Sequence, residues 1–284
     1  MRINPQNSRK LVRTATQNTS PLACIHWPSG ANTVQQAGLS HEMGNMKWAI
    51  VTGGSRGLGY ATAQGLIAQG ISVYIIGQDA ARAQASAQKL GCKYRAVDVA
   101  DSKKFREVLV DITNEATANG FGPLDILVLA HGVMSEKMSK TLRTNDEEWR
   151  RTLSINLDAV FTAINQLAPA MAEVRNNSRV IVYSACLGRM SGPGTHGGLA
   201  PYRISKAGVN ALVKNLSYET GNGARGFLVD AICPNHSRTD MGGPDAPRSA
   251  EEGAETAIWL ATREFDPAVD KTGFLWEDRQ IVEW

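Results

Sequence analysis

The segment KWAIVTGGSRGLG, Lys47–Gly59, places an apolar β-like run directly before a glycine-rich turn and the start of a helical pattern. Glycines at such a turn let the backbone bend tightly and approach a pyrophosphate, whose charge is favoured at a helix N-terminus. A glycine motif alone is a weak signal, because glycines are common in any tight turn. Its position between a strand and a helix favours a dinucleotide-binding turn, with Gly53, Gly57 and Gly59 as its signature.

Beyond this turn, short apolar runs alternate with longer helical patterns. The runs are β-branched on both parities, which is typical of strands covered by helices on both faces. This alternation predicts βαβ units, and therefore one Rossmann-type α/β domain with a doubly wound parallel sheet and helices on both faces. The expected strands are Lys47–Gly53, Ile71–Ile76, Cys92–Val99, Leu124–Ala130, Arg179–Ser184, Phe227–Cys233 and Gly273–Trp276, and the expected helices are Leu58–Gln69, Ala80–Leu90, Ser102–Asn119, Asp146–Glu173, Ala200–Thr220 and Ala250–Ala261.

The N-terminal segment differs from the rest of the chain. Residues 1–41 contain no Asp or Glu, are rich in Asn, Gln, Ser and Thr, and show no sustained periodicity. We expect residues 1–45 to be a disordered extension and residues 46–284 to be one NAD(P)-binding domain. An organellar transit peptide and a start codon placed too early are the alternatives. The predicted location is cytoplasmic, or organellar if the leader is a transit peptide.

Composition narrows the class of partner. The chain is 43% hydrophobic and 20% charged, with a net charge of +3, and has no apolar run long enough to span a bilayer. No basic cluster interleaves with aromatic residues, so we expect neither a nucleic-acid nor a membrane partner. Four widely separated cysteines form no C-x-x-C pair, which indicates reduced thiols and no metal site. They are Cys24, Cys92, Cys186 and Cys233.

The end of the second expected strand bears on the choice of cofactor. A carboxylate there would accept the ribose hydroxyls of NAD and repel a 2′-phosphate. Gly77 occupies the position expected for that acid, and Asp79, two residues later, is expected to be a helix N-cap. Arg56 in the glycine turn could meet a 2′-phosphate, although Gln78 stands where a second basic residue would strengthen the case. The pattern favours NADP(H) over NAD(H).

A second motif carries acid–base chemistry. Tyr202 and Lys206 are one helical turn apart in PYRISKAG, so both project from the same face near a helix N-terminus. A lysine there can lower the pKa of the phenol by electrostatics and make Tyr202 a usable acid near neutral pH. A Y-x-x-x-K motif is frequent by chance. Its place here, in the helix after the fifth expected strand, favours an acid–base role over a plain surface pair.

Together these segments resemble the short-chain dehydrogenase/reductase family, specifically its carbonyl-reductase-like members. The resemblance covers Lys47 to Trp284 and implies NADP(H)-linked reduction of a ketone or aldehyde, or oxidation of the alcohol. Members of the family are monomers, dimers or tetramers, so the resemblance allows a homo-oligomer without specifying its size. The matching segments are TGGSRGLG, VDV at Val97–Val99, LSINLDAVF around Asn156, YRISK, the run Arg238–Ala261 and the terminal GFLWEDRQIVEW.

The resemblance also implies residue roles. Tyr202 would be the proton donor, Lys206 would hold the nicotinamide ribose and lower the phenol pKa, and Asn156 would organise a proton-relay water. Asp98 and Val99 would contact the adenine, and Thr239 would lie near the pyrophosphate or carboxamide. The full set expected to bind the cofactor is Gly53, Ser55, Arg56, Gly57, Leu58, Gly59, Asp98, Val99, Lys206, Pro234 and Thr239.

Two loops depart from the family pattern. Leu129–Gly132 reads LAHG where the family usually has Asn-Asn-Ala-Gly, so His131 is unexpected and either touches the adenosine ribose or has no role. After the sixth strand the usual Pro-Gly becomes Pro234-Asn235. His236 follows there, and either meets substrate or lies in the loop without contacting it. The segment Asn235–Ser249 is short for a substrate lid, which favours an open site for small or varied carbonyl compounds.

The catalytic serine is a further departure. The family places two serines at the end of the fifth strand, and the second polarises the substrate carbonyl. Counting back from Gly188, Ser184 matches the first and Ala185 the second. Neighbouring strand residues face opposite sides, yet the long segment before Tyr202 allows a slip of one residue. We therefore predict Ser184 as the catalytic serine, with Ser191 or Thr195 as alternatives.

The altered loops and Ala185 also support a rival function from another class. In that reading the chain is an NADP(H)-binding regulatory or interaction module with little or no catalysis. The presence of Tyr202, Lys206 and Asn156 together argues for the enzyme, because a pure binder has no physical need for all three.

Overall fold

The computed structural model describes residues 46–284 apart from 137–138, 175–176, 193–195 and 267. Contacts divide the chain into a unit Met1–Ser40 and a unit His41–Trp284, and the fold described below lies within the second. The expected extension, residues 1–45, lies outside the described residues, so its disorder stays a prediction.

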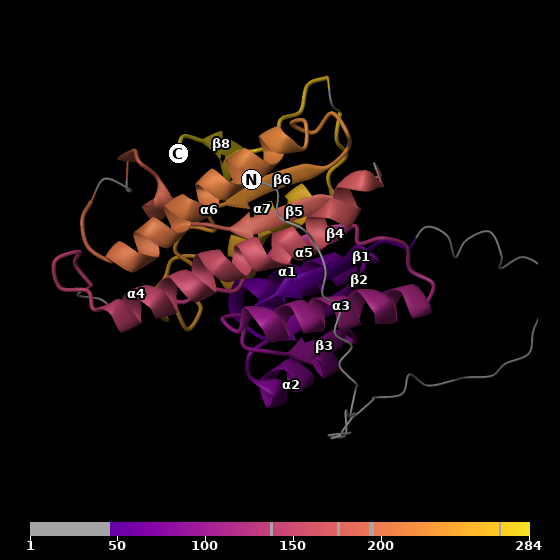
Figure 1. The fold of residues 1–284 in the computed structure, drawn as a ribbon, viewed down its shortest axis with the longest axis horizontal. Helices are drawn as coiled ribbons and strands as arrows, with labels where there is room; N and C mark the ends of the chain where they lie inside the picture. Colours follow the sequence, from indigo (N-terminus) through magenta and orange to yellow (C-terminus); the bar gives the residue numbers. More distant parts are fainter. Residues whose placement is uncertain (1–45, 137–138, 175–176, 193–195, 267) are drawn as a thin grey trace, which may run out of the picture. The chain divides into compact units, whose positions relative to one another are not determined.

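One eight-stranded sheet organises the domain, in the order β3-β2-β1-β4-β5-β6-β7-β8 (Figure 1). Every neighbouring pair is parallel except β7 and β8, which are antiparallel. The central strands β1, β4, β5 and β6 are buried along their whole length, as their continuous apolar sequences require. The strands are β1 Trp48–Thr52, β2 Ser72–Gly77, β3 Lys93–Ala96, β4 Ile126–Leu129, β5 Arg179–Tyr183, β6 Leu228–Ile232, β7 Leu275–Glu277 and β8 Gln280–Val282.

Helices cover both faces of the sheet (Figure 1). Apolar side chains of α3, α5 and α6 form one core with the strands, and those of α1, α2 and α7 form a second core on the other face. This arrangement confirms the predicted doubly wound α/β fold. The helices are α1 Gly57–Ala68, α2 Ala80–Leu90, α3 Ser102–Ala118, α4 Asp146–Leu153, α5 Ala159–Glu173, α6 Ala200–Glu219 and α7 Ala250–Thr262.

Two local features differ from the expectation. The single helix expected over Asp146–Glu173 is interrupted by a π-helical segment, η2, at Ser154–Asp158. The C-terminal segment forms a hairpin rather than one strand, because Asp278 and Arg279 both adopt positive φ and reverse the chain between β7 and β8. Positive φ at two successive residues is the geometry of a tight hairpin turn, which usually carries Asn-Gly, so Asp-Arg gave no signal.

The topology determines where a ligand can bind. The chain places β2 and β3 on one side of β1 and then crosses to the other side of β1 with β4, so the strand order reverses at β1. In open parallel sheets, the crevice beside such a strand, at its carboxyl end, is the usual ligand site. The glycine turn follows β1 directly and therefore lies at this position.

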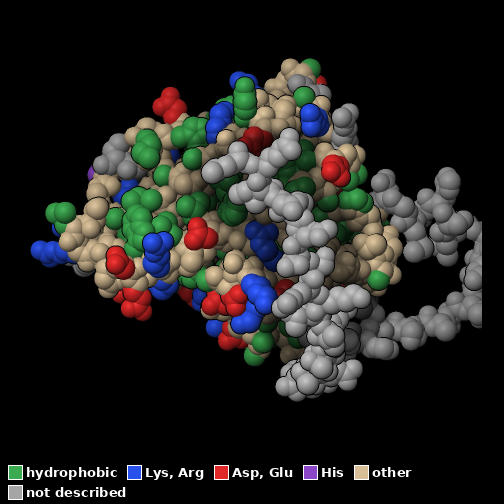
Figure 2. Space-filling model, viewed as in Figure 1, with side chains coloured by type: hydrophobic (Ala, Val, Ile, Leu, Met, Phe, Trp, Pro, Cys, Tyr) green, Lys and Arg blue, Asp and Glu red, His purple; other side chains and the backbone are tan. Residues whose placement is uncertain are grey.

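The surface in Figure 2 carries Lys, Arg, Asp and Glu side chains interspersed across the visible face of the described residues. This agrees with the small net charge of +3. Among the described residues, no helix combines the length and apolarity needed to cross a membrane.

Candidate active site

The glycine turn is built so that only glycine fits. Gly53 and Gly57 adopt φ of 67° and 54°, in the left-handed region. A Cβ on Gly59 would lie 2.3 Å from the carbonyl oxygen of Gly53, and one on Gly53 would lie 2.8 Å from the backbone nitrogen of His131. The turn thus brings bare backbone to the N-terminus of α1, as expected for a pyrophosphate cradle.

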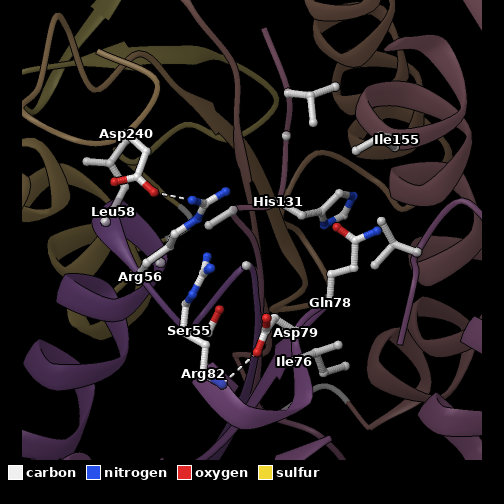
Figure 3. A pocket seen from close by; sticks show the side chains of 18 of the residues that line it. Ser55, Arg56, Leu58, Ile76, Gln78, Asp79, Arg82, His131, Ile155 and Asp240 are labelled. Carbon is white, nitrogen blue, oxygen red and sulfur yellow. Dashed lines mark hydrogen bonds and ion pairs between the residues drawn. The ribbon is translucent and has the colours of Figure 1, made fainter. Parts of the chain in front are cut away.

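A cavity of about 570 Å³ opens over this turn (Figure 3). It extends from the ends of β2 and β3 across the glycine turn to the loops after β4 and β6, which is the position expected for a dinucleotide. Lys206 and Pro234 do not line it. The other predicted cofactor residues do, and these are Gly53, Ser55, Arg56, Gly57, Leu58, Gly59, Asp98, Val99 and Thr239.

Two arginines contribute positive charge to the cavity. Figure 3 shows the side chains of Arg56 and Arg82 directed toward the middle of the pocket. Arg56 forms an ion pair with Asp240, which links the glycine turn to the loop after β6. Asp79 is the N-cap of α2, as predicted, and its carboxylate accepts from the backbone nitrogen of Arg82 at 2.8 Å. Sequence reasoning missed Arg82, although the first turn of α2 lies at the same sheet edge as the glycine turn.

The end of β2 explains the missing carboxylate. A Cβ on Gly77 would lie 2.8 Å from the hydroxyl oxygen of Ser55, so an acidic side chain at this position would have to displace Ser55. Gln78 instead donates from Nε2 to Asp98 Oδ2 at 3.3 Å. Position 77 itself therefore carries no carboxylate, and the acidic side chains that line this edge are Asp79, which caps α2, and Asp98, which accepts from Gln78.

His131 is buried rather than exposed in a loop. Its Nδ1 lies 2.6 Å from the hydroxyl of Thr52, and its ring packs edge-on against Phe105. Burial lowers the pKa of His131 to about 3, and the charge of Lys206 adds to that shift. The imidazole is therefore neutral and joins β1, β4 and α3 beneath the cavity that it lines.

Tyr202 and Lys206 lie side by side in the first turns of α6, and both are buried. Lys206 Nζ donates to the carbonyl oxygen of Tyr183 at 2.7 Å and lies 5.8 Å from the centre of the Tyr202 ring. Burial lowers the pKa of Lys206 to about 8. The end of β5 therefore holds the ammonium group beside the phenol.

The pKa of Tyr202 departs from the sequence expectation. Burial raises it above its ordinary value, and the thiols of Cys233 and Cys186 add to the increase. The expected lowering of this pKa is therefore wrong for this conformation, because desolvation of the phenolate dominates. The phenol is neutral at physiological pH and available as a proton donor.

Asn156 is fully buried in the π-helical segment η2. Its Oδ1 accepts from the backbone nitrogen of Val133 at 2.8 Å, and its Nδ2 donates to the carbonyl oxygen of Val133 at 2.9 Å. Nδ2 also lies 3.1 Å from the hydroxyl of Ser205 on α6. The side chain therefore ties the loop after β4 to the helix that carries Tyr202, and π-helical turns of this kind are frequent at functional sites.

Gly132 connects the cavity with these groups. It lines the cavity, and a Cβ placed on it would lie 3.4 Å from Asn156 Oδ1 and 3.6 Å from Lys206 Nζ. The fold therefore brings Asn156 and Lys206 to the margin of the predicted cofactor site.

The hydroxyl of Ser184 is directed to α6. It donates to Asn210 Oδ1 at 2.5 Å and approaches the carbonyl oxygen of Lys206 at 3.4 Å. Ala185, the next residue, is also buried. Of the alternatives, Ser191 donates to the carbonyl oxygen of Trp284 at 3.3 Å, and Thr195 lies outside the described residues. A catalytic role for Ser184 stays a prediction, and its contacts show a second use for the same hydroxyl.

The loop after β6 folds back on itself beside the cavity. Ser237 donates to the carbonyl oxygen of Pro234 at 3.1 Å, and Nε2 of His236 lies 2.7 Å from the carbonyl oxygen of Gly242. Thr239 lies against the glycine turn, where a Cβ on Gly57 would be 3.0 Å from its methyl group. The loop therefore brings Thr239 into the cavity, while Pro234 and His236 do not line it.

Sequence and structure comparisons agree with this arrangement. A family model described as short chain dehydrogenase matches residues 47–249. The 3-oxoacyl-[acyl-carrier-protein] reductase FabG of Escherichia coli is 34% identical over 197 residues, which cover 69% of this chain and 75% of the relative. Carbonyl reductase [NADPH] 1 of Sus scrofa is 27% identical and covers 84% of this chain and 95% of its own.

A solved structure extends the comparison. The short chain dehydrogenase of Burkholderia cenocepacia in complex with NADP has a TM-score of 0.65 and 27% identity, covering 76% of this chain and 91% of its own. The matched range includes β1, the glycine turn, Tyr202 and Lys206. The chain belongs to the short-chain dehydrogenase family of oxidoreductases.

Proposed function

We propose that this protein is an NADP(H)-dependent reductase that converts a small ketone or aldehyde to its alcohol, and catalyses the reverse reaction. The observation that carries the proposal is the continuity of the site. A backbone cradle with two arginines leads through Gly132 to Asn156 and Lys206, with Tyr202 beside them.

The residues present fit the cofactor. Bare backbone at Gly53 and Gly59 suits a pyrophosphate, since a Cβ at either position would collide with its neighbours. Arg56 and Arg82 suit a 2′-phosphate, because guanidinium groups pair with phosphate through charge-assisted hydrogen bonds. Two related proteins, carbonyl reductase [NADPH] 1 of Sus scrofa and the Burkholderia cenocepacia dehydrogenase in complex with NADP, carry this cofactor in their names and support NADP(H) over NAD(H).

When bound, the nicotinamide would supply or accept the hydride. The chain's own part is proton transfer and positioning. Tyr202 holds its proton at physiological pH because burial raises its pKa, so the phenol can give that proton to the forming alcohol oxygen. Lys206 holds its place through Tyr183 and would contact the nicotinamide ribose. Asn156 holds the loop after β4 in place through Val133, and this loop lies between the Asn156 side chain and the cavity.

The substrate is proposed only as a class. The similar reductases act, by their names, on a 3-oxoacyl group and on carbonyl compounds, and both groups contain a ketone or aldehyde carbon. The cytoplasmic location and a homo-oligomer remain predictions from the sequence.

The proposal is tested by replacing the proton donor. Tyr202→Phe is expected to lower kcat with NADPH by about 100- to 10,000-fold, the usual contribution of a positioned general acid, across aldehydes, ketones and quinones. NADPH binding, measured by fluorescence titration, should change little. Tyr218→Phe is the matched control, because Tyr218 lies on the same helix and is 76% exposed.

Equal turnover in wild-type protein and Tyr202→Phe would exclude the phenol as the proton donor. Tight NADPH binding without turnover on the whole panel would favour the rival regulatory module. Two observations support this rival: Ala185 stands where the family has its second serine, and the Ser184 hydroxyl is hydrogen-bonded to Asn210.

A further inference from the structure

Two cysteines meet beside the catalytic tyrosine. Tyr183 of β5 pairs with Ile232 of β6, so the residues that follow each strand lie at the same edge of the sheet. Cys186 begins a short 3₁₀ turn, η3 (Cys186–Gly188), after β5, and Cys233 directly follows β6. The backbone nitrogen of Cys186 donates to Cys233 Sγ at 3.1 Å, so the two cysteines are in direct contact. They are 47 residues apart in the sequence and adjacent in the fold.

The pair is asymmetric. Cys233 is buried, whereas Cys186 is partly exposed. The neighbouring Cys233 thiol lowers the pKa of Cys186, and the backbone of Leu187 and the charge of Arg189 act in the same direction. The Cys186 thiol, together with burial, raises the pKa of Cys233. Cys186 is therefore the thiol that a hydroperoxide can reach and that reacts first, and Cys233 is its buried partner.

Both cysteines belong to the surroundings of Tyr202, because each adds to the raised pKa of its phenol. The turn η3 also presses on α6. A Cβ on Gly188 would lie 2.7 Å from the backbone carbon of Lys206, and the carbonyl oxygen of Gly188 accepts from Asn210 Nδ2 at 3.3 Å. A shift of η3 therefore moves the helix that positions Tyr202 and Lys206.

We propose that Cys186 and Cys233 form a redox pair that hydroperoxides oxidise to a disulfide, and that this disulfide slows turnover at Tyr202. The Cys186 thiolate attacks the terminal oxygen of the hydroperoxide, the O–O bond breaks, and the alcohol leaves with one proton. The Cys233 sulfur then attacks the sulfenic sulfur of Cys186, the S–O bond breaks, and water leaves with the Cys233 proton. The two thiols lose two electrons in total, which reduce the hydroperoxide to alcohol and water.

The effect on turnover rests on the proposed function, whereas the oxidation itself does not. A disulfide holds its sulfurs about 2.05 Å apart, closer than two thiols that are not bonded, so η3 or the start of the loop after β6 must shift. A misplacement of about 1 Å near the reacting atoms typically costs about 100-fold in rate. We therefore expect the disulfide to lower turnover by at least about tenfold.

The test uses the reduced full chain treated with hydrogen peroxide or cumene hydroperoxide. Peptide mapping by mass spectrometry without reductant should find a Cys186–Cys233 linked peptide, lighter than the two free peptides by two hydrogen atoms. Carbonyl reduction should fall at least about tenfold and return with dithiothreitol. Cys92→Ala is the matched control, since this half-buried cysteine follows α2 and its pKa is raised by burial. It should keep both the linked peptide and the loss of turnover.

Cys233→Ala should yield no linked peptide and leave a Cys186 sulfenic acid that dimedone traps, while Cys186→Ala should remove both products. If Cys186 and Cys233 stay alkylatable after treatment, or link to Cys24 or Cys92 instead, the redox pair is wrong. A Cys186–Cys233 disulfide without loss of turnover overturns the proposed effect on Tyr202. If no carbonyl is reduced by untreated protein, the proposed function fails, and the linked peptide still decides the redox pair.

Discussion

At the scale of single residues, Arg82 is expected to distinguish NADPH from NADH. Its guanidinium lines the cavity together with that of Arg56, and a charge-assisted hydrogen bond contributes about 1.5–3 kcal/mol. Arg82→Ala is therefore expected to weaken NADPH binding by about 10- to 100-fold and to leave NADH binding nearly unchanged. Fluorescence titration with both cofactors measures this split.

Arg225→Ala, in an exposed position after α6, is the matched control for lost charge and should bind NADPH as the wild type does. Equal weakening of NADPH and NADH by Arg82→Ala would mean that the arginine does not recognise the 2′-phosphate.

Ser184 offers a second test at this scale. Its hydroxyl is hydrogen-bonded to Asn210 on α6, so in this conformation it ties the end of β5 to the helix that carries Tyr202 and Lys206. We expect Ser184→Ala to lower the free energy of unfolding by about 1–3 kcal/mol, because a buried carbonyl oxygen loses its donor. The loss in kcat should stay below about tenfold, less than the usual effect of an oxyanion donor.

Urea unfolding and steady-state kinetics on the same preparation measure the two effects. A loss of about 100- to 1000-fold in kcat with unchanged stability would instead assign Ser184 to the reacting carbonyl, as the sequence prediction has it.

At the scale of elements, the turn between β1 and α1 depends on close backbone packing. Gly59→Ala would place a Cβ 2.3 Å from the carbonyl oxygen of Gly53, so the turn must shift. Overpacking of this kind costs about 1–3 kcal/mol, and we expect NADPH binding to weaken by about tenfold or more. Titration with NADPH and a thermal melt report the two consequences.

Gly122→Ala is the matched control, because a Cβ there meets no atom within 4 Å and its φ is not positive. If Gly59→Ala binds NADPH with wild-type affinity, the cradle assigned to this turn is wrong.

At the scale of the whole molecule, a buried carboxyl links the sheet to the C-terminal segment. Asp230 of β6 accepts from Trp276 Nε1 at 2.9 Å, from the Phe274 backbone nitrogen at 3.2 Å and from the Thr272 hydroxyl at 3.3 Å. Burial raises the pKa of Asp230 to about 7, against the hydrogen bonds and the charge of Arg263. The proton is therefore held more tightly in the folded chain than in the unfolded one.

This shift makes stability depend on pH. The folded state binds more protons than the unfolded state between about pH 4 and 7, so the contribution of Asp230 to stability falls as pH rises through that window. The change is on the order of 3–4 kcal/mol at most. Asp230→Asn keeps an oxygen for Trp276 and Phe274 and should flatten the slope, as measured by urea unfolding at several pH values.

Asp245→Asn, in an exposed loop, is the control and should keep the wild-type slope. An unchanged slope in Asp230→Asn would show that other groups produce the pH dependence.

The fold was largely predictable because its signals are local. Strand and helix periodicities, the glycine turn and the Tyr202–Lys206 spacing each lie within a short segment, and a parallel sheet with right-handed crossovers leaves few ways to arrange them. The same holds for the N-cap at Asp79. The π-helical segment around Asn156 and the hairpin at Asp278 escaped prediction because neither has a distinct sequence pattern.

The site was predictable only in part. Nine of the residues expected to bind the cofactor line the cavity, since family motifs mark them. Arg82 was missed, because its place in the cavity depends on how α2 packs against the glycine turn. The neutral, buried state of His131 and the raised pKa of Tyr202 also escaped prediction, because burial depends on which elements cover a residue.

By itself, the sequence determined the doubly wound sheet, the backbone cradle and the pairing of Tyr202 with Lys206, because each depends on residues close together in the chain. Three other features follow from packing: Ser184 donates to Asn210, Arg82 lines the same cavity as Arg56, and Cys186 contacts Cys233. These contacts join residues 26 to 47 positions apart. Such pairs come together only when strands and helices pack, and no local pattern encodes that packing.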